Sequence, residues 1–71
     1  MIITTDTDIG AWLRKRRMEL GLKQKEAAKM AGITAPGLCH VENGTVRPFM
    51  ETLLLLGKAL DFEIEIREKC R

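Results

Sequence analysis

The sequence predicts a mainly α-helical domain of four helices followed by one β-strand. Residues 22–44 contain a helix stop followed at once by a helix start, which indicates two short helices joined by a tight turn. On either side of this pair, residues 9–20 and 53–60 carry apolar side chains at helical spacing. From residue 61 the pattern changes to strict alternation, which is typical of a half-buried strand.

The chain has 71 residues and a formal net charge of +2. We expect a single domain over residues 1–71, near the lower size limit for a self-sufficient core, so that a partner subunit would help to stabilise it. Residues 9–31 hold seven basic and two acidic side chains, so a polyanion would meet one end of the molecule. The alternative is an ordinary solvated face of a charged helix.

The first helix is predicted over residues 8–20, with its start near the N-cap candidate Thr7. Its apolar stripe consists of Ile9, Leu13 and Leu20. Trp12 lies at the edge of the stripe, where it is either partly buried or an anchor for a partner.

The basic residues at positions 14–16 are expected to point mostly to water. Arg17 follows Leu13 by four residues and precedes Leu20 by three, which turns it toward the core. A buried arginine needs a carboxylate partner.

The second helix opens at residues 23–25, and its alanines leave a face that another helix can cross closely, with Ala28 as the predicted crossing point. Gly32 ends this helix, and Thr34 is a good N-cap for the next one. The third helix is predicted over residues 34–41. Leu38 and Val41 should face the core together, and Asn43 with Gly44 forms the C-cap dipeptide.

Four pieces of this stretch stand at restrictive mutual spacing: G-x-x-Q at residues 21–24, Ala28, A-G-I-T at residues 31–34, and V-E-N-G at residues 41–44. They resemble the helix-turn-helix of the phage-repressor and Cro family (XRE-type) of bacterial DNA-binding proteins. With Arg17, Pro48 and the leucines of residues 53–60, the resemblance covers residues 9–60.

This resemblance implies a four-helix repressor-like DNA-binding domain. It also implies an ion pair between Arg17 and Glu42, with two independent surface charges as the alternative.

Contacts with the DNA backbone are expected at the start of the second helix and in the loop after the third. Free N–H groups at a helix start suit a phosphate, and the family's glutamine at position 24 usually contacts one. Arg47, near the end of the loop, is either a further phosphate contact or a solvated side chain. The predicted phosphate contacts are Lys23, Gln24, Lys25, Asn43 and Arg47.

The third helix should be the recognition element that enters the major groove. The predicted base contacts are Thr34, Ala35, Pro36 and His40. Relatives carry polar base-reading side chains at positions 35, 36, 37 and 40, and of these only His40 can hydrogen-bond a base edge here. Ala35 and Pro36 offer apolar contact, for instance to a thymine methyl. An idle surface role for His40 is the alternative.

The fourth helix is predicted over residues 49–60. Its core stripe is Leu53, Leu56 and Leu60, and Leu54 and Leu55 widen this stripe. Phe49 or Met50 is expected to close the bottom of the hydrophobic core. So many leucines in a short helix exceed the need of one small domain, which suggests that another subunit covers part of the surface.

Residues 61–71 are predicted as a dimerisation strand and tail, with Phe62, Ile64 and Ile66 on one side. Within the chain only residues 2–5 could pair with this strand, so the alternative is the same strand of a second copy, crossing antiparallel about a two-fold axis. This arrangement resembles the antitoxin repressors of the HipB type, which are partners of kinase-like toxins.

We therefore expect a homodimeric, sequence-specific transcriptional regulator that binds double-stranded DNA at a palindromic operator and represses its own operon. An antitoxin module that neutralises a kinase-like toxin is the alternative. An enzyme, a cofactor and a metal site are not expected, because the single histidine has no acid, nucleophile or metal partner at a recognisable spacing. Cys39 and Cys70 are expected as free thiols, and the lack of a signal peptide or spanning apolar run indicates a cytoplasmic protein.

Overall fold

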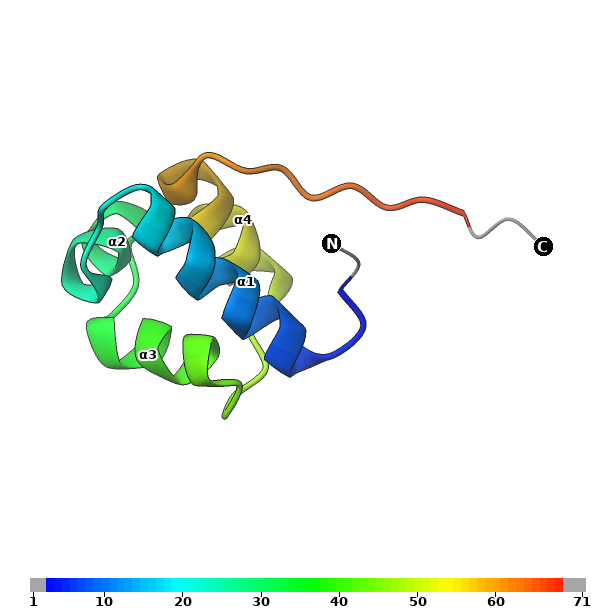
Figure 1. Cartoon of the computed structure of the whole chain (residues 1–71), viewed down its shortest axis with the longest axis horizontal. Coiled ribbons are helices and arrows are strands. Elements are labelled where there is room, and N and C mark those ends of the chain that lie inside the picture. Colours follow the sequence, from blue (N-terminus) through cyan, green and yellow to red (C-terminus); the bar gives the residue numbers. More distant parts are fainter. Residues whose placement is uncertain (1–2, 69–71) are drawn as a thin grey trace.

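The computed structural model describes residues 3–68, which form four helices and an extended C-terminal segment (Figure 1). The helices are α1 (Asp6–Glu19), α2 (Gln24–Ala31), α3 (Ala35–Asn43) and α4 (Met50–Leu60). α1 packs against α3, and α2 packs against both α3 and α4. The predicted mainly α fold of four helices is confirmed.

The core is formed by side chains from all four helices. The fully buried leucines are Leu13, Leu38, Leu56 and Leu60. The buried alanines are Ala27, Ala28 and Ala31 of α2. Because these alanines are small, α3 and α4 can both approach α2 closely, and the expectation of a close crossing at position 28 agrees with its 1% exposure.

Gly10 lies at the closest approach of α1 and α3, a role that sequence patterning did not reveal. A Cβ at this position would lie 2.7 Å from the main-chain oxygen of Glu42 and would also collide with the carbonyl oxygen of Val41. Both neighbours are backbone atoms, which cannot rotate away. The glycine therefore sets the distance between the two helices.

α1 begins earlier than predicted, because Thr5 and not Thr7 is its N-cap. The Thr5 hydroxyl accepts a hydrogen bond from the Asp8 backbone N–H at 3.1 Å, and the Asp8 carboxylate accepts one from the Thr5 N–H at 3.2 Å. This reciprocal capping box needs a carboxylate three residues after the cap, and Asp8 meets that requirement for Thr5.

The turns around α3 have the predicted chemistry. Gly32 caps α2 in the left-handed conformation with φ 74°, and Gly44 caps α3 in the same way. The Thr34 hydroxyl accepts a hydrogen bond from the Gly37 N–H at 3.1 Å, so Thr34 is the N-cap of α3. α3 ends at Asn43, two residues beyond the prediction.

Several apolar side chains that were predicted to cover the core are exposed: Leu20, Leu54, and both alternatives for the lower end of the core, Phe49 and Met50. Phe49 is 81% exposed and Met50 54% exposed, so neither closes the bottom of the domain. Phe49 is the N-cap of α4 and Leu20 the C-cap of α1, and both therefore leave the apolar stripe of their helix. Leu20 is 40% exposed as a result.

The predicted C-terminal strand is not formed within the single chain, in the part of the tail that the structure describes. Residues 62–68 are extended but form no strand, and Figure 1 shows them leading away from the helices. A strand needs a neighbour to complete its hydrogen bonds, and no segment within residues 3–68 supplies one. Residues 69–71 and Ile2, the start of the proposed N-terminal partner, lie outside the described residues.

Phe62 packs onto its own chain, although it was predicted to hold a dimer. Its ring meets Trp12 edge to face, with centroids 4.9 Å apart and planes at 83°. The Phe62 N–H donates a hydrogen bond to the Gly57 carbonyl at 2.9 Å. Trp12 is thereby partly buried in the manner expected.

Candidate nucleic-acid interface

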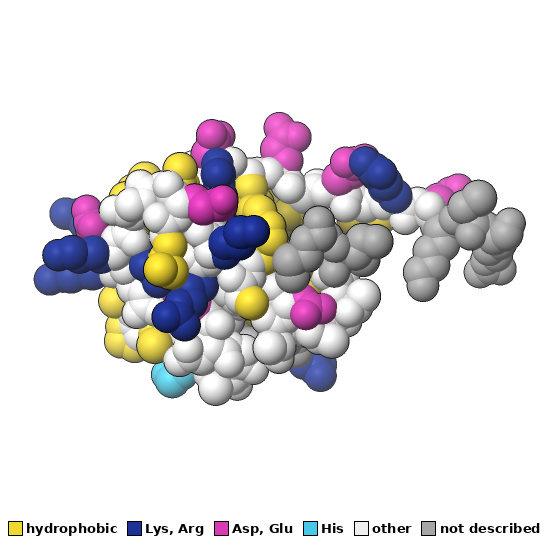
Figure 2. Space-filling model, in the orientation of Figure 1, with side chains coloured by type: hydrophobic (Ala, Val, Ile, Leu, Met, Phe, Trp, Pro, Cys, Tyr) yellow, Lys and Arg dark blue, Asp and Glu magenta, His cyan; other side chains and the backbone are white. Residues whose placement is uncertain are grey.

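α3 turns one side into the core and leaves the other side accessible. Leu38 and Val41 are buried, whereas Pro36 and His40 are exposed. Pro36 lies in the first turn of the helix, where its missing N–H costs nothing. In the space-filling view the histidine, in cyan, stands at the lower edge of the molecule (Figure 2).

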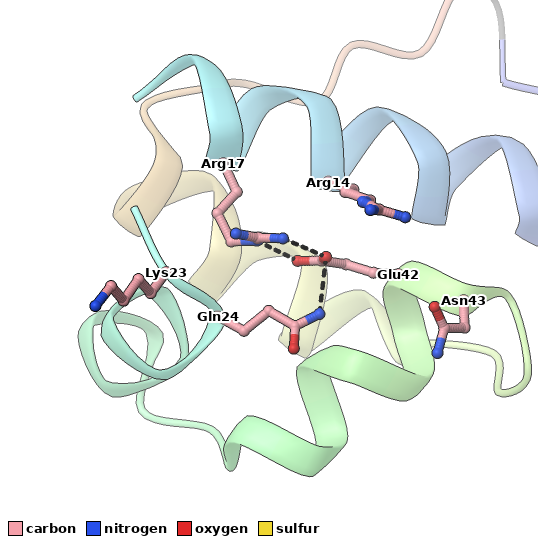
Figure 3. Close-up of a pocket in the computed structure, with 6 residues that line it drawn as sticks. All are labelled: Arg14, Arg17, Lys23, Gln24, Glu42 and Asn43. Atoms are coloured by element: carbon pink, nitrogen blue, oxygen red, sulfur yellow. Dashed lines mark hydrogen bonds and ion pairs between the residues drawn. The ribbon is translucent and has the colours of Figure 1, made fainter. Parts of the chain in front are cut away.

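Behind α3 an ion pair ties α1 to α3. The Arg17 Nε atom donates to Glu42 Oε2 at 2.8 Å, and Arg17 Nη2 donates to Glu42 Oε1 at 3.0 Å (Figure 3). The side chains are 11% and 1% exposed, so this is the buried pair that the family resemblance implied. The hydrogen bonds to Glu42 raise the pKa of Arg17 above its ordinary value, against the opposing effect of burial.

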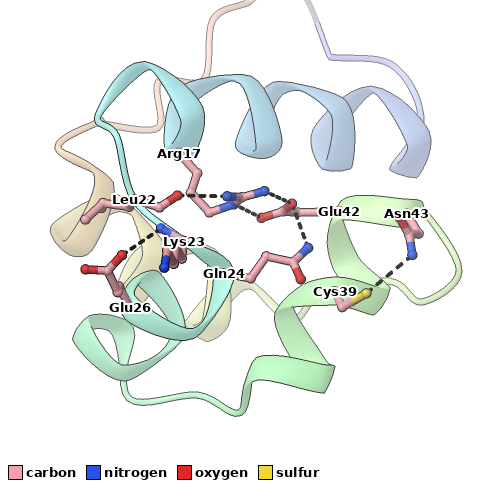
Figure 4. Close-up of polar contacts among 8 residues, drawn as sticks. All are labelled: Arg17, Leu22, Lys23, Gln24, Glu26, Cys39, Glu42 and Asn43. Carbon is pink, nitrogen blue, oxygen red and sulfur yellow. Dashed lines mark hydrogen bonds and ion pairs between the residues drawn. The ribbon is translucent and has the colours of Figure 1, made fainter.

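Two further hydrogen bonds complete the network around this pair. Arg17 Nη1 donates to the Leu22 carbonyl at 2.8 Å, which fixes the chain between α1 and α2 (Figure 4). Gln24 Nε2 donates to Glu42 Oε1 at 3.1 Å. Within residues 3–68 no buried side-chain nitrogen or oxygen lacks a hydrogen-bond partner. The network therefore places the first residue of α2 against the last turn of α3.

An open pocket of about 440 Å³ lies over this network. Its lining residues are Arg14, Arg17, Lys23, Gln24, Glu42 and Asn43, which come from α1, the start of α2 and the end of α3 (Figure 3). Because Arg17 already neutralises Glu42, the charges of Arg14 and Lys23 are in excess. The pocket is therefore electropositive and is a suitable place for an anion.

Of the five predicted phosphate contacts, the structure brings Lys23, Gln24 and Asn43 to this pocket. Lys25 lies on α2 outside it, and Arg47 lies in the loop after α3; both side chains are exposed. Arg14 also lines the pocket, although it was expected to point mostly to water. The sequence does not show that the ends of two other helices lie opposite this side chain.

Arg16 was also assigned to water, and this is wrong. Its Nε donates to the Leu60 carbonyl at 2.9 Å and its Nη2 to the Asp61 carbonyl at 3.1 Å, so it fastens the end of α4 to α1. The acceptors are main-chain atoms, which leave no signature in the sequence.

Three of the four predicted base-contact residues lie at the start or along the accessible side of α3, whereas Ala35 packs against the core. Thr34 and Pro36 are exposed, and Ala35 is half-buried. His40 is oriented by the residue that follows the helix cap, because its Nδ1 lies 3.2 Å from the Thr45 hydroxyl. Its other ring nitrogen, Nε2, has no hydrogen bond among the described residues.

Cys39 is half-buried on α3 and accepts a hydrogen bond from Asn43 Nδ2 at 3.5 Å (Figure 4). Residues 3–68 contain no group of three or more His, Cys, Asp or Glu side chains that could hold a metal ion. Cys70 lies outside the described residues. In the described part of the chain, no helix has the length and apolarity needed to cross a membrane.

A glycine-capped helix, a short turn and a second helix with one accessible side define a helix-turn-helix protein. The sequence matches the Helix-turn-helix family over residues 13–66, and the chain belongs to that family.

Two relatives illustrate this membership. The chain is 38% identical over 52 residues to YqaF of Bacillus subtilis (strain 168), an uncharacterized HTH-type transcriptional regulator, and the match spans 73% of this chain and 68% of YqaF. It is 31% identical over 58 residues to the ImmF control region 10 kDa protein of Bacillus phage phi105, over 82% of this chain and 64% of that protein.

Solved structures share the fold. The restriction-modification controller protein C.AhdI from Aeromonas hydrophila superposes with a TM-score of 0.80 at 31% identity, over 82% of this chain and 88% of C.AhdI. The P22 c2 repressor, solved in complex with a synthetic operator, superposes with a TM-score of 0.74 at 30% identity, over 86% of this chain and 88% of the repressor chain.

Proposed function

We propose that this protein is a homodimeric, sequence-specific DNA-binding transcriptional regulator that inserts α3 into the major groove of a palindromic operator. The observation that carries the proposal is the accessible side of α3 beside the electropositive pocket at the start of α2. The likeness to the P22 c2 repressor, which was solved in complex with a synthetic operator, supports DNA as the partner. Repression is proposed by analogy with the P22 c2 repressor, and its own operon is the proposed target.

Backbone phosphates would be held by Lys23, Gln24, Lys25, Asn43 and Arg47. Gln24 is suited to this role because one of its amide hydrogens goes to Glu42, which orients the amide and leaves a second hydrogen for a phosphate. The N–H groups and positive dipole at the start of α2 would add to the attraction.

Base edges would be read by Thr34, Ala35, Pro36 and His40. Only Thr34 and His40 carry polar groups, and the Thr34 hydroxyl already accepts a hydrogen bond as the N-cap of α3. Readout would therefore combine the His40 imidazole and the hydroxyl hydrogen of Thr34 with apolar contacts to thymine methyl groups.

The phosphate contacts can be tested through the salt dependence of binding. The wild-type protein would be titrated against a duplex selected from a random pool, at several salt concentrations. Lys23→Ala should weaken binding and flatten the log-log salt slope by about one unit per dimer half, because one phosphate contact is lost. Lys58→Ala, an exposed residue of α4, is the matched control and should change neither quantity. Unchanged slopes in both variants would remove Lys23 from the contact surface.

A second copy of the chain would supply the symmetry that a palindrome requires. Leu54 is 54% exposed, and the tail residues Ile64 and Ile66 are 41% and 88% exposed, so these apolar side chains are available to a partner. Two copies joined through this surface would need to place their α3 helices about 34 to 36 Å apart, which is one turn of duplex.

An antitoxin role is the second candidate. It is favoured by the few polar groups on α3 and by Phe49, which is 81% exposed at the start of α4 and would suit a protein partner. A kinase-like protein encoded beside this one should then co-purify with it. Retention of that partner by Phe49→Ser would count against an interface at the start of α4.

A further inference from the structure

The His40 ring is joined to Thr45 by a short chain of hydrogen bonds. The Thr45 hydroxyl donates to the His40 main-chain oxygen at 3.1 Å, and the His40 Nδ1 atom lies 3.2 Å from the same hydroxyl oxygen. The Thr45 N–H also donates to the His40 carbonyl at 3.1 Å, which holds Thr45 in position after the cap of α3.

This arrangement favours a proton on one of the two ring nitrogens, Nδ1. A threonine hydroxyl has one hydrogen, and the 3.1 Å distance to the His40 carbonyl oxygen assigns it to that acceptor. If it pointed to Nδ1 instead, the hydroxyl oxygen and the carbonyl oxygen would face each other at 3.1 Å with no hydrogen between them. Both bonds form only when Nδ1–H donates to the hydroxyl oxygen. The neutral ring then has an unprotonated Nε2.

We propose that His40, in its neutral form, presents Nε2 to the major groove as a hydrogen-bond acceptor and selects bases that carry an amino group. The proposal rests on the DNA-binding function proposed above and adds the chemistry of one recognised base. Thr45 is the residue that positions this acceptor, although it need not touch DNA.

The major groove presents suitable donors only on two bases. Adenine offers N6–H₂ and cytosine offers N4–H₂, whereas guanine O6 and thymine O4 are acceptors in the corresponding places. An Nε2 lone pair facing either oxygen would be repelled. With the opposite tautomer, Nε2–H would instead donate to guanine O6 or N7, thymine O4 or adenine N7, so Thr45 decides whether an amino group or an acceptor atom is read.

The tautomer can be measured on the free protein. Long-range proton–nitrogen correlation spectra in alkaline buffer, where the ring is neutral, should show the proton on Nδ1. Thr45→Val removes the acceptor of this proton and should shift the ring toward the Nε2–H form, while Thr45→Ser keeps the hydroxyl and should leave it unchanged. A proton on Nε2 in the wild-type protein would overturn the proposal without any reference to DNA.

The base can be identified with modified duplexes. After a binding sequence has been selected from a random pool, each adenine is replaced by purine and each cytosine by 2-pyrimidinone, which lack the exocyclic amino group. At one position per half-site, this replacement should weaken the binding of the duplex by the wild-type protein roughly tenfold to a hundredfold. His40→Ala should bind the modified and unmodified duplexes equally, and Thr45→Ser should behave like the wild type.

The possible outcomes separate this proposal from the proposed function. If no duplex is selected at all, the DNA-binding function fails, and the base readout fails with it. If duplexes are selected but removal of amino groups affects wild-type and His40→Ala proteins alike, DNA binding stands and His40 is not the acceptor. Sensitivity to loss of a guanine or thymine oxygen that disappears in His40→Ala would show the opposite tautomer at work.

Discussion

At the scale of single residues, Glu42 is the acceptor around which the buried polar network of the domain is arranged. Its carboxylate is 1% exposed and accepts hydrogen bonds from Arg17 and Gln24. A buried charge without a partner is strongly destabilising, whereas a pair with well-formed hydrogen bonds is tolerated. Loss of either partner should therefore affect both the stability of the domain and the position of α2.

This dependence leads to a prediction for the Arg17–Glu42 pair. Arg17→Met or Glu42→Leu should each lower the free energy of unfolding by about 3 to 5 kcal/mol, because each leaves one buried charge alone. The double variant should recover part of this loss. Denaturant unfolding of the two single variants and the double variant would measure these differences.

The tail contains a matched control for this prediction. Arg67 and Glu65 form an ion pair with the same 2.8 Å distance but with side chains 80% and 68% exposed. Arg67→Met should cost less than about 1 kcal/mol, as exposed pairs do. If Arg17→Met also lowers the free energy of unfolding by less than this limit, the network around Glu42 contributes little to the stability of the domain.

At the scale of the helices, the contact between α1 and α3 depends on the absence of one side chain. Helix propensity alone predicts that Gly10→Ala stabilises the protein by about 1 kcal/mol. The structure predicts the opposite, since the added methyl group would meet the main chain of α3. We expect Gly10→Ala to destabilise the domain by about 1 to 3 kcal/mol, the usual range for overpacking.

The neighbouring residue provides the control for Gly10. Ala11 is exposed on the same helix, and Ala11→Gly should cost about 1 kcal/mol through propensity alone. Thermal unfolding of the two variants compares a clash with a propensity change in one element. If Gly10→Ala raises the melting temperature, then α1 and α3 can move apart without a loss of stability.

The start of α1 should respond to pH. Hydrogen bonds from Thr4, first from its N–H and then from its hydroxyl, and further bonds from Thr5 lower the pKa of Asp8 below its ordinary value of 3.8. Because the pKa is lower in the folded state, the carboxylate stabilises the fold above pH 3.8, and this contribution is lost as the pH falls through the lowered pKa. Asp8→Asn should reduce stability at neutral pH and match the wild type in acid.

Circular dichroism at the helix wavelength, followed during thermal unfolding across this pH range, would measure that effect. The difference in melting temperature between wild type and Asp8→Asn should narrow as the buffer becomes acidic. A difference that stays constant with pH would mean that the capping box acts through its neutral hydrogen bonds and not through the charge.

At the scale of the whole molecule, the proposed dimer depends on apolar side chains that a single copy leaves uncovered. Figure 1 shows the tail extending away from the helices, and its isoleucines at positions 64 and 66 are 41% and 88% exposed. Burying an isoleucine side chain contributes about 1.5 to 3 kcal/mol. Two per copy would therefore add materially to association, together with the exposed Leu54 of α4.

We predict that a chain ending at Phe62, which keeps the contact with Trp12, dissociates at least about tenfold more readily than the full chain. Ile64→Lys should have the same direction of effect. Met30→Lys, at a 58% exposed position on α2, is the control and should leave association unchanged. Sedimentation equilibrium over a range of concentrations would decide, and an undiminished dimer in the shortened chain would place the interface on the helices alone.

Features that depend on near neighbours could be predicted from the sequence. The four helices, the glycine caps at positions 32 and 44, the N-cap Thr34 and the buried stripe of Leu38 and Val41 all follow from spacing within one or two helical turns. Such features are local because helix hydrogen bonds join residues four apart. The pairing of Arg17 with Glu42 came from family resemblance, since spacing alone left independent surface charges open.

Features that join distant parts of the chain became visible only in the folded molecule. It placed Arg16 on the carbonyls that end α4, Gly10 against α3, and Phe62 against Trp12, and it left Phe49 outside the core. These outcomes depend on main-chain atoms and on the relative positions of whole helices, neither of which is encoded in the periodicity of a segment. The missing strand has the same cause, because an alternating pattern becomes a strand only where a neighbouring strand completes its hydrogen bonds.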